Sequence, residues 1–139
     1  MTESSYHNDV IDITQVLARY ALSMSKGDYA GAVSVFTPDG TYHAFGETRT
    51  VEELPAYLDG APHGLVVAAP PLVEIDGDEA TGEQIVYWVD QATHAARLGY
   101  WSDTYLRTPE GWRVRSRSLT FLRRSGQLNS GKHVPKASA

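Results

Sequence analysis

The chain has 139 residues, of which 42% are hydrophobic and 21% charged, which is enough apolar material for the core of one domain and too much for a disordered chain. It contains no cysteine, which excludes disulfides, thiolate catalysis and cysteine-ligated zinc. It also lacks an apolar run long enough to span a bilayer and the basic-then-apolar order of a secretion signal, so we expect a cytoplasmic protein with no membrane partner.

The charge is distributed unevenly along the chain. Residues 1–106 carry four basic and sixteen acidic side chains, whereas residues 107–139 carry eight basic side chains and one acidic one. A basic C-terminal third is one feature of nucleic-acid-binding proteins, but no exposed aromatic residues alternate with these bases, as a binder of single strands needs. We therefore expect solvated or interfacial arginines and no nucleic-acid partner.

A long amphipathic helix is predicted first. Residues 9–25 place apolar side chains at three- and four-residue spacing, which gives a helix one apolar stripe. Asn8 or Asp9 can cap its start, and Gly27 can take the positive φ with which helices often end. Residues 1–7 precede this pattern, and we expect them to form a flexible N-terminus.

Two shorter helices and a strand are predicted next. Residues 29–36 form the second helix, which stops at a Thr-Pro-Asp-Gly turn, and residues 41–46 form a strand. Thr50 and Glu53 have the spacing of a capping box, in which each side chain bonds the backbone amide of the other. A third helix is therefore expected over residues 50–58.

A long β region follows. Its strands are predicted over residues 65–75, 79–91, 97–107 and 112–124, and the first two are joined by a hairpin turn at Asp76-Gly77. Pro70-Pro71 forces the first strand to bulge or to lie at an edge, because proline donates no backbone hydrogen bond. The remaining residues, 125–139, read as a polar tail that is disordered or lies over a partner.

Helices followed by an antiparallel meander define an α+β fold. Three helices beside a strongly bent sheet would form a cone, and the open mouth of a cone is a natural pocket for a small molecule. We expect this domain to cover residues 8–124.

Alternation along the last strands predicts which side chains lie inside. Arg113, Arg115 and Arg117 alternate and so share one face, which we expect to meet solvent or another subunit. The opposite face, which includes Ser118, is small and mildly polar and suits a cavity wall. Asp103, on the strand before, either pairs with Arg117 or points into the pocket, and we favour the ion pair.

Two segments resemble a known family. The runs RYALSMSKGDYAGAVSVFTPDGTY (19–42) and GYWSDTYLRTPEGWRVRSR (99–117) resemble the SnoaL-like branch of the nuclear-transport-factor-2-like (NTF2-like) superfamily. His63, followed by an apolar strand and the IDGDEA hairpin, fits the same pattern. The resemblance implies a cone-shaped α+β barrel in which three helices pack on a curved, mixed, mostly antiparallel sheet. It also implies a homodimer or homotrimer.

Within that branch the chain is most similar to the subgroup that contains scytalone dehydratase and bile-acid 7α-dehydratase, whose members use neither metal nor organic cofactor. The resemblance implies that His63 is the general base and that Tyr20 and Tyr42 donate hydrogen bonds to a carbonyl or hydroxyl. Elimination beside a carbonyl needs this set, because a base takes the proton while a donor stabilises the developing enolate oxygen. Tyr20 also lies in the apolar stripe of the first helix, so a purely structural role is equally open.

The chain departs from the subgroup at one position. The aspartate that would support the histidine falls at Ser25, whose hydroxyl can bond an imidazole but cannot supply a negative charge. Asp90 and Asp103 are the carboxylates that could substitute for it. Without such a substitute, either the chemistry differs from that of the subgroup or there is none, and in the latter case the chain is a binding domain that has lost the catalytic pair.

Three hypotheses therefore stand. The first is a cofactor-independent lyase or isomerase, of dehydratase or cyclase type, that acts on a hydrophobic, ring-containing small molecule by histidine acid/base catalysis. The second is a non-catalytic small-molecule-binding domain, and the third is a structural subunit that assembles through its sheet. The residues expected to contact the small molecule are Met24, Ser25, Trp88, Trp101 and Ser118. No metal site is expected, since no two histidines are spaced four apart on a helix and cysteine is absent.

Overall fold

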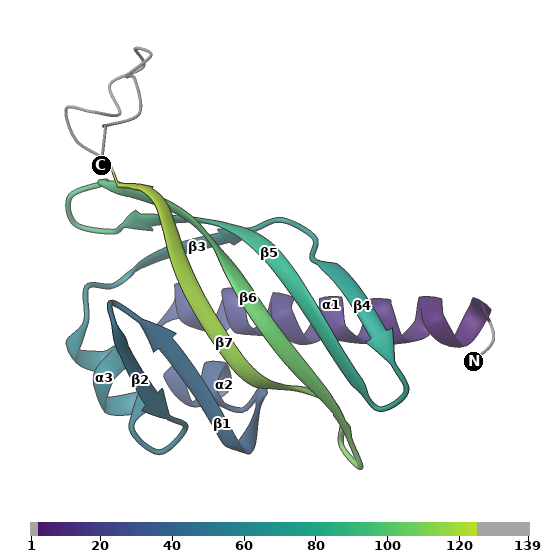
Figure 1. Ribbon diagram of the computed structural model, residues 1–139. Helices are drawn as coiled ribbons and strands as arrows, with labels where there is room; N and C mark the ends of the chain where they lie inside the picture. Colours follow the sequence, from purple (N-terminus) through teal and green to yellow (C-terminus); the bar gives the residue numbers. More distant parts are fainter. Residues whose placement is uncertain (1–2, 125–139) are drawn as a thin grey trace, which may run out of the picture.

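The computed structural model describes residues 3–124, in which three helices pack against one sheet (Figure 1). The helices are α1 (Glu3–Lys26), α2 (Tyr29–Val33) and α3 (Leu54–Gly60). The strands are β1 (Phe36–Ala44), β2 (Glu47–Thr50), β3 (Gly64–Ala68), β4 (Leu72–Asp76), β5 (Glu79–Asp90), β6 (Ala96–Thr108) and β7 (Gly111–Arg124). The tail predicted over residues 125–139 lies outside the described part of the chain.

The sheet is mixed and mostly antiparallel. Its strand order is β2-β1-β7-β6-β5-β3, with β4 paired to β5 beside β3. Within this order β1 and β7 run parallel, whereas the other pairs are antiparallel. The long strands curve over α1, and α2 and α3 lie at the end where β1 and β2 are found (Figure 1). The predicted α+β cone is therefore confirmed.

The first helix carries the predicted apolar stripe but starts earlier than expected, at Glu3. Asp9 is consequently inside the helix and does not cap it. Its buried carboxylate accepts hydrogen bonds from Arg107 Nη1 at 2.8 Å, Arg107 Nη2 at 2.7 Å and Trp112 Nε1 at 3.0 Å. These bonds tie the N-terminal half of α1 to the hairpin formed by β6 and β7. At the other end the expected positive φ at Gly27 is confirmed.

Several predicted boundaries were wrong, for local reasons. The predicted turn at residues 37–40 lies inside β1, where a register irregularity between Phe36 and Thr41 accommodates it. The third helix begins at Leu54 because Thr50 ends β2, although the Glu53 carboxylate does accept from the Thr50 amide at 3.0 Å. The strand predicted over residues 65–75 is two strands, β3 and β4, separated at the two prolines.

A bulge in β7 changes which side chains face inward. Tyr105 pairs with Val114, whereas the preceding Thr104 pairs with Ser116, so Arg115 is an extra residue in β7. Because of it, Val114 and Arg117 both lie on the inner face and both are buried. The expectation that Arg117 faces solvent with its neighbours was therefore wrong. Ser118, which lies between the inward-facing Arg117 and Leu119, is turned to the opposite face of the sheet and away from the cavity.

Candidate functional site

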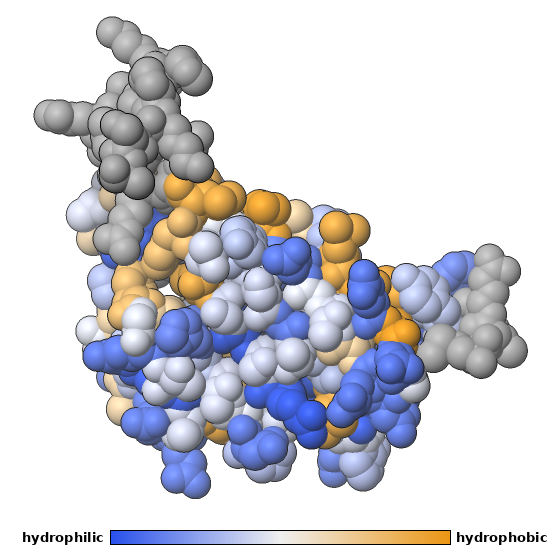
Figure 2. All heavy atoms as spheres, viewed as in Figure 1, coloured by the Kyte–Doolittle hydropathy of each residue, from blue (hydrophilic) through white to orange (hydrophobic). Residues whose placement is uncertain are grey.

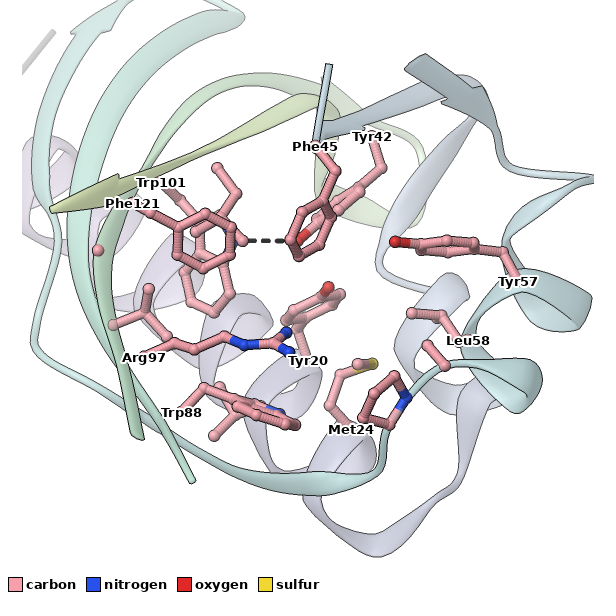
Figure 3. A pocket seen from close by; sticks show the side chains of 16 residues that line it. Tyr20, Met24, Tyr42, Phe45, Tyr57, Leu58, Trp88, Arg97, Trp101 and Phe121 are labelled. Atoms are coloured by element: carbon pink, nitrogen blue, oxygen red, sulfur yellow. Dashed lines mark hydrogen bonds between the residues drawn. The ribbon is translucent and has the colours of Figure 1, made fainter. Parts of the chain in front are cut away.

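A cavity of about 230 Å³ lies between α1, α3 and the inner face of the sheet (Figure 3). Its lining is mostly apolar and rich in aromatic side chains: Tyr20 from α1, Tyr42 from β1, Phe45 just after β1, Tyr57 from α3, Trp88 from β5, Trp101 from β6 and Phe121 from β7. An apolar cavity of roughly 150 Å³ is known to hold benzene. This one is larger, so its size and lining suit a molecule with one or two rings.

Two tyrosine hydroxyls supply hydrogen-bonding groups deep in the cavity. Trp101 Nε1 donates to the Tyr42 hydroxyl at 3.4 Å (Figure 3), and a side-chain hydrogen bond between Tyr20 and Tyr42 contributes to the pKa of both groups. Tyr20 stacks edge-on against Trp101, with ring centroids 5.6 Å apart. Burial raises the pKa of Tyr42, and burial followed by the neighbouring Tyr42 raises the pKa of Tyr20. Both side chains are therefore neutral hydrogen-bond donors at neutral pH.

A buried ionic network supports these aromatic rings from behind. Asp103 accepts from Arg117 Nε at 2.8 Å and from its Nη2 at 2.9 Å, and it also accepts from the Tyr105 hydroxyl at 2.8 Å. The Arg117 guanidinium lies 3.8 Å from the centre of the Trp101 ring, and Gln84 Oε1 accepts from its Nη2. Burial alone would lower the pKa of Arg117, but Asp103 holds it above its usual value. The geometry agrees with the predicted Asp103–Arg117 ion pair, and it leaves Asp103 outside the cavity lining.

The imidazole of His63 does not line the cavity. Its Nε2 lies 3.0 Å from the carbonyl oxygen of Asp59, and its ring packs edge-on against Tyr29 with centroids 5.5 Å apart. The preceding residue, Pro62, lines the cavity wall instead. The loop between α3 and β3 thus brings His63 next to the site but turns its side chain toward the end of α3.

The carboxylate of Asp90 is occupied elsewhere as well. Its Oδ1 accepts hydrogen bonds from the backbone amides of Ala92 at 2.8 Å and Thr93 at 3.0 Å, in the turn between β5 and β6. The amides of Thr93 and then Ala92 hold the pKa of Asp90 below its usual value. Asp90 therefore organises a turn, and His63 has no hydrogen bond with it or with Asp103 among the described residues.

Ser25, at the position where the family subgroup carries an aspartate, joins α1 to β3. Its hydroxyl donates to the Ala21 carbonyl at 2.8 Å and accepts from the Val66 amide at 2.9 Å. The residue that position 25 faces across the helix–sheet boundary is therefore Val66, whose side chain lines the cavity. Among the described residues, Ser25 makes no hydrogen bond with His63.

The structure thus divides the expected site residues. It brings Tyr20, Met24, Tyr42, Trp88 and Trp101 together around the cavity. It does not bring His63, Asp90, Asp103, Ser25 or Ser118 into the lining.

Sequence reasoning missed Arg97, whose side chain reaches into the cavity from the start of β6 (Figure 3). Its guanidinium lies 4.5 Å from the centre of the Trp88 ring. The alternation of the strand could have predicted this position, because Arg97, Gly99 and Trp101 are two residues apart along β6 and so share its inner face.

The polar side chains of the cavity donate hydrogen bonds but do not accept protons at neutral pH. They are the tyrosine hydroxyls and the Arg97 guanidinium, and over residues 3–124 neither a carboxylate nor an imidazole joins them. No group of three or more histidine, aspartate or glutamate side chains that could hold a metal occurs in the same part of the chain. None of the helices described is long and apolar enough to cross a membrane. The arrangement can bind and polarise an oxygen atom of a ligand.

The fold and the cavity together define a small α+β cone with an aromatic pocket for a small molecule. The chain belongs to the SnoaL-like domain family, whose model matches residues 6–118. The resemblance to the SnoaL-like, NTF2-like superfamily is therefore confirmed. Comparison with curated proteins gives no significant match.

Solved structures share the fold at low sequence identity. A protein of unknown function from Mycobacterium tuberculosis is 25% identical over 86% of this chain and 75% of its own, with a TM-score of 0.79. A candidate scytalone dehydratase from Novosphingobium aromaticivorans is 14% identical over 98% of this chain and 95% of its own, with a TM-score of 0.81. A hexachlorocyclohexane dehydrochlorinase is 10% identical over 98% of this chain and all of its own, with a TM-score of 0.79.

Proposed function

We propose that the protein is a binding domain for a hydrophobic, ring-containing small molecule. The ring packs among the aromatic side chains of the cavity, and an oxygen atom of the ligand accepts a hydrogen bond from Tyr42 or Tyr20. The observation that carries this proposal is the composition of the cavity wall. It offers apolar surface and hydrogen-bond donors, and its described part lacks a base.

A second candidate is the cofactor-independent lyase or isomerase, of dehydratase or cyclase type. What favours it is the pair of buried hydroxyls with raised pKa, since neutral donors in a dry site stabilise a developing enolate oxygen. Its proton acceptor would be His63, after the imidazole leaves the Asp59 carbonyl and turns past Pro62. Because that rearrangement is needed first, binding without turnover is the function that this geometry supports better.

One experiment separates the two functions. Calorimetric titration with 1-tetralone, a neutral bicyclic ketone, measures binding, and NMR in D₂O measures exchange of the protons beside its carbonyl. We expect binding with no exchange above the uncatalysed rate.

Tyr42→Phe should weaken binding by about 2- to 12-fold, the range for one hydrogen bond, whereas Tyr87→Phe, on the outer face of β5, should leave it unchanged. Accelerated exchange that His63→Ala slows by about 10²–10⁴-fold would establish the lyase or isomerase instead.

We also propose that the outer face of the sheet joins two or more copies of the chain. The support is a set of exposed apolar side chains on adjacent strands, with Leu65 and Val67 on β3 and Ile85 and Tyr87 on β5. Figure 2 shows hydrophobic residues gathered along the upper part of the molecule, while much of the rest of that face is polar. Light scattering should report an oligomer that Ile85→Glu dissociates. A monomeric wild-type protein would rule out this assembly.

A further inference from the structure

Arg97 places a positive charge inside an otherwise neutral aromatic cavity. Its guanidinium lies 4.5 Å from the centre of the Trp88 ring and 5.7 Å from that of Phe45, and Figure 3 shows it directed toward the interior. The side chain is half-buried, so it stands nearer to solvent than the buried hydroxyls of Tyr20 and Tyr42. The cation and the hydroxyls therefore occupy different depths of the same cavity.

No acidic side chain in the described part of the chain pairs with this guanidinium. The ion pairs formed there use Arg49, Arg107, Arg115 and Arg117 as their cations, and the Arg97 side chain makes neither an ion pair nor a hydrogen bond with another described residue. The nearby Asp90 feels its charge only as a minor influence, because the Asp90 carboxylate is bonded to backbone amides. The donors of Arg97 are thus available to a ligand.

The electrostatics of the cavity consequently favour an anion. Attraction between unit charges strengthens as the surroundings become less polar, and aromatic walls exclude water. A guanidinium presents parallel N–H donors whose geometry matches the two oxygens of a carboxylate. Stacking on Trp88 holds the guanidinium plane in place, so less freedom is lost when a carboxylate binds.

We propose that Arg97 is a specificity-determining residue that binds a carboxylate of the ligand, so that the natural ligand is a ring-containing carboxylic acid. This inference rests on the proposed binding function and narrows its ligand class. The ring lies between Trp88 and Trp101, the carboxylate pairs with Arg97 toward the mouth, and an oxygen at the far end of the ring accepts from Tyr42.

A purely structural role for Arg97 makes a different prediction. Arginine often covers apolar surface with its stem and stacks on a ring without binding any ligand. In that case a substitution of Arg97 changes the thermal stability of the protein but does not change how it discriminates between a charged ligand and a neutral one. The test must therefore compare two ligands of the same shape.

The matched probes are naphthalene-2-carboxylate and the neutral naphthalene-2-carboxamide, with dissociation constants measured by calorimetry. We expect the wild-type protein to prefer the carboxylate by about 10- to 100-fold, the range for hydrogen bonds to a charged group. Arg97→Gln should abolish this preference, because it weakens binding of the carboxylate far more than binding of the carboxamide. Arg19→Gln, an equal loss of charge on the exposed side of α1, should preserve it.

The outcomes separate the inference from the function on which it rests. Equal affinity of the wild-type protein for the two probes, or a carboxylate preference that survives Arg97→Gln, would overturn the inference while the binding function stands. Failure of both probes and of 1-tetralone to bind would overturn the binding function and the inference with it. The wild-type preference is itself diagnostic, so the test does not depend on the Gln variant folding, and Arg97→Lys should retain part of the preference.

Discussion

The hydroxyl of Ser25 accepts a hydrogen bond from the amide of Val66 at 2.9 Å, so the two positions face each other where α1 packs on β3. Val66 lines the cavity, and Ser25 stands immediately behind it. We expect a carboxylate at the first position and an imidazole at the second to lie close enough to interact at the cavity wall. In this chain a hydroxyl and an isopropyl group occupy those places, and neither of them accepts a proton at neutral pH.

Installing that pair should create a base. In the double variant Ser25→Asp, Val66→His we expect the pKa of the new imidazole to rise above its usual value of about 6.5, because the adjacent carboxylate stabilises the charged form. The single variant Val66→His should show a lower pKa, since burial without a counter-charge favours the neutral form. NMR titration of the imidazole protons measures both. Identical titration midpoints in the two variants would show that positions 25 and 66 do not cooperate.

Removing one partner of the Asp103–Arg117 ion pair should strongly destabilise the fold. Both side chains are fully buried, so removing the carboxylate strands a guanidinium away from water. We expect Asp103→Ala to lower the free energy of unfolding by about 3–5 kcal/mol in urea denaturation. The exposed Arg115–Glu79 pair provides the comparison, where Glu79→Ala should cost at most about 1 kcal/mol. Losses of equal size would contradict the role assigned to burial.

Stability at acid pH should depend on Asp9. The hydrogen bond from Arg107, followed by that from Trp112, lowers the pKa of Asp9 against the opposing effect of burial. A carboxyl whose pKa is lower in the folded state stabilises the protein above its unfolded pKa of about 4, and this contribution disappears as the pH falls through the folded pKa.

Asp9→Asn should therefore lower the free energy of unfolding at neutral pH by about 1–3 kcal/mol, toward the smaller value because Arg107 is partly exposed and screened. The difference between the variant and the wild type should shrink below about pH 4. Asp78→Asn is the control, since Asp78 also contacts Arg107 but is exposed. A difference that stays constant down to the acid limit would exclude Asp9 as the titrating group.

Patterns that repeat along the sequence predicted the fold well, and single irregular residues account for what they missed. The stripe of α1 and the hairpin at Asp76-Gly77 follow from spacing and turn chemistry alone, and both are present. The extra residue at Arg115 leaves no mark in the alternation, yet it reverses the orientation of the β7 side chains that follow it, as far as a second irregularity after Phe121. That reversal buries Arg117 and removes Ser118 from the cavity wall.

The site was predictable to the extent that its residues lie inside regular elements. Tyr20 and Tyr42 project from a helix and a strand. The family resemblance predicted that both contact the ligand, and both line the cavity. His63 lies in a loop, where the path of the backbone and not any periodicity decides the direction of the side chain. The alternation along β6 places Arg97 on the same face as Trp101. An arginine near the end of a strand is nevertheless usually exposed to solvent, so the sequence alone does not single it out.

Gly99 should be a point at which the cavity wall does not tolerate a side chain. A Cβ atom there would collide with the carbonyl oxygen of Thr120, so β7 would have to move away from β6. Gly99→Ala should therefore lower the free energy of unfolding by about 1–3 kcal/mol, the usual cost of overpacking. Because the displaced strand carries Leu119 and Phe121 of the wall, binding of naphthalene-2-carboxylate should weaken as well.

Gly60→Ala is the control. It lies in α3 with nothing near the added methyl group, so it should be neutral or slightly stabilising. Equal effects of the two substitutions on urea denaturation would show that β6 and β7 can separate there without cost.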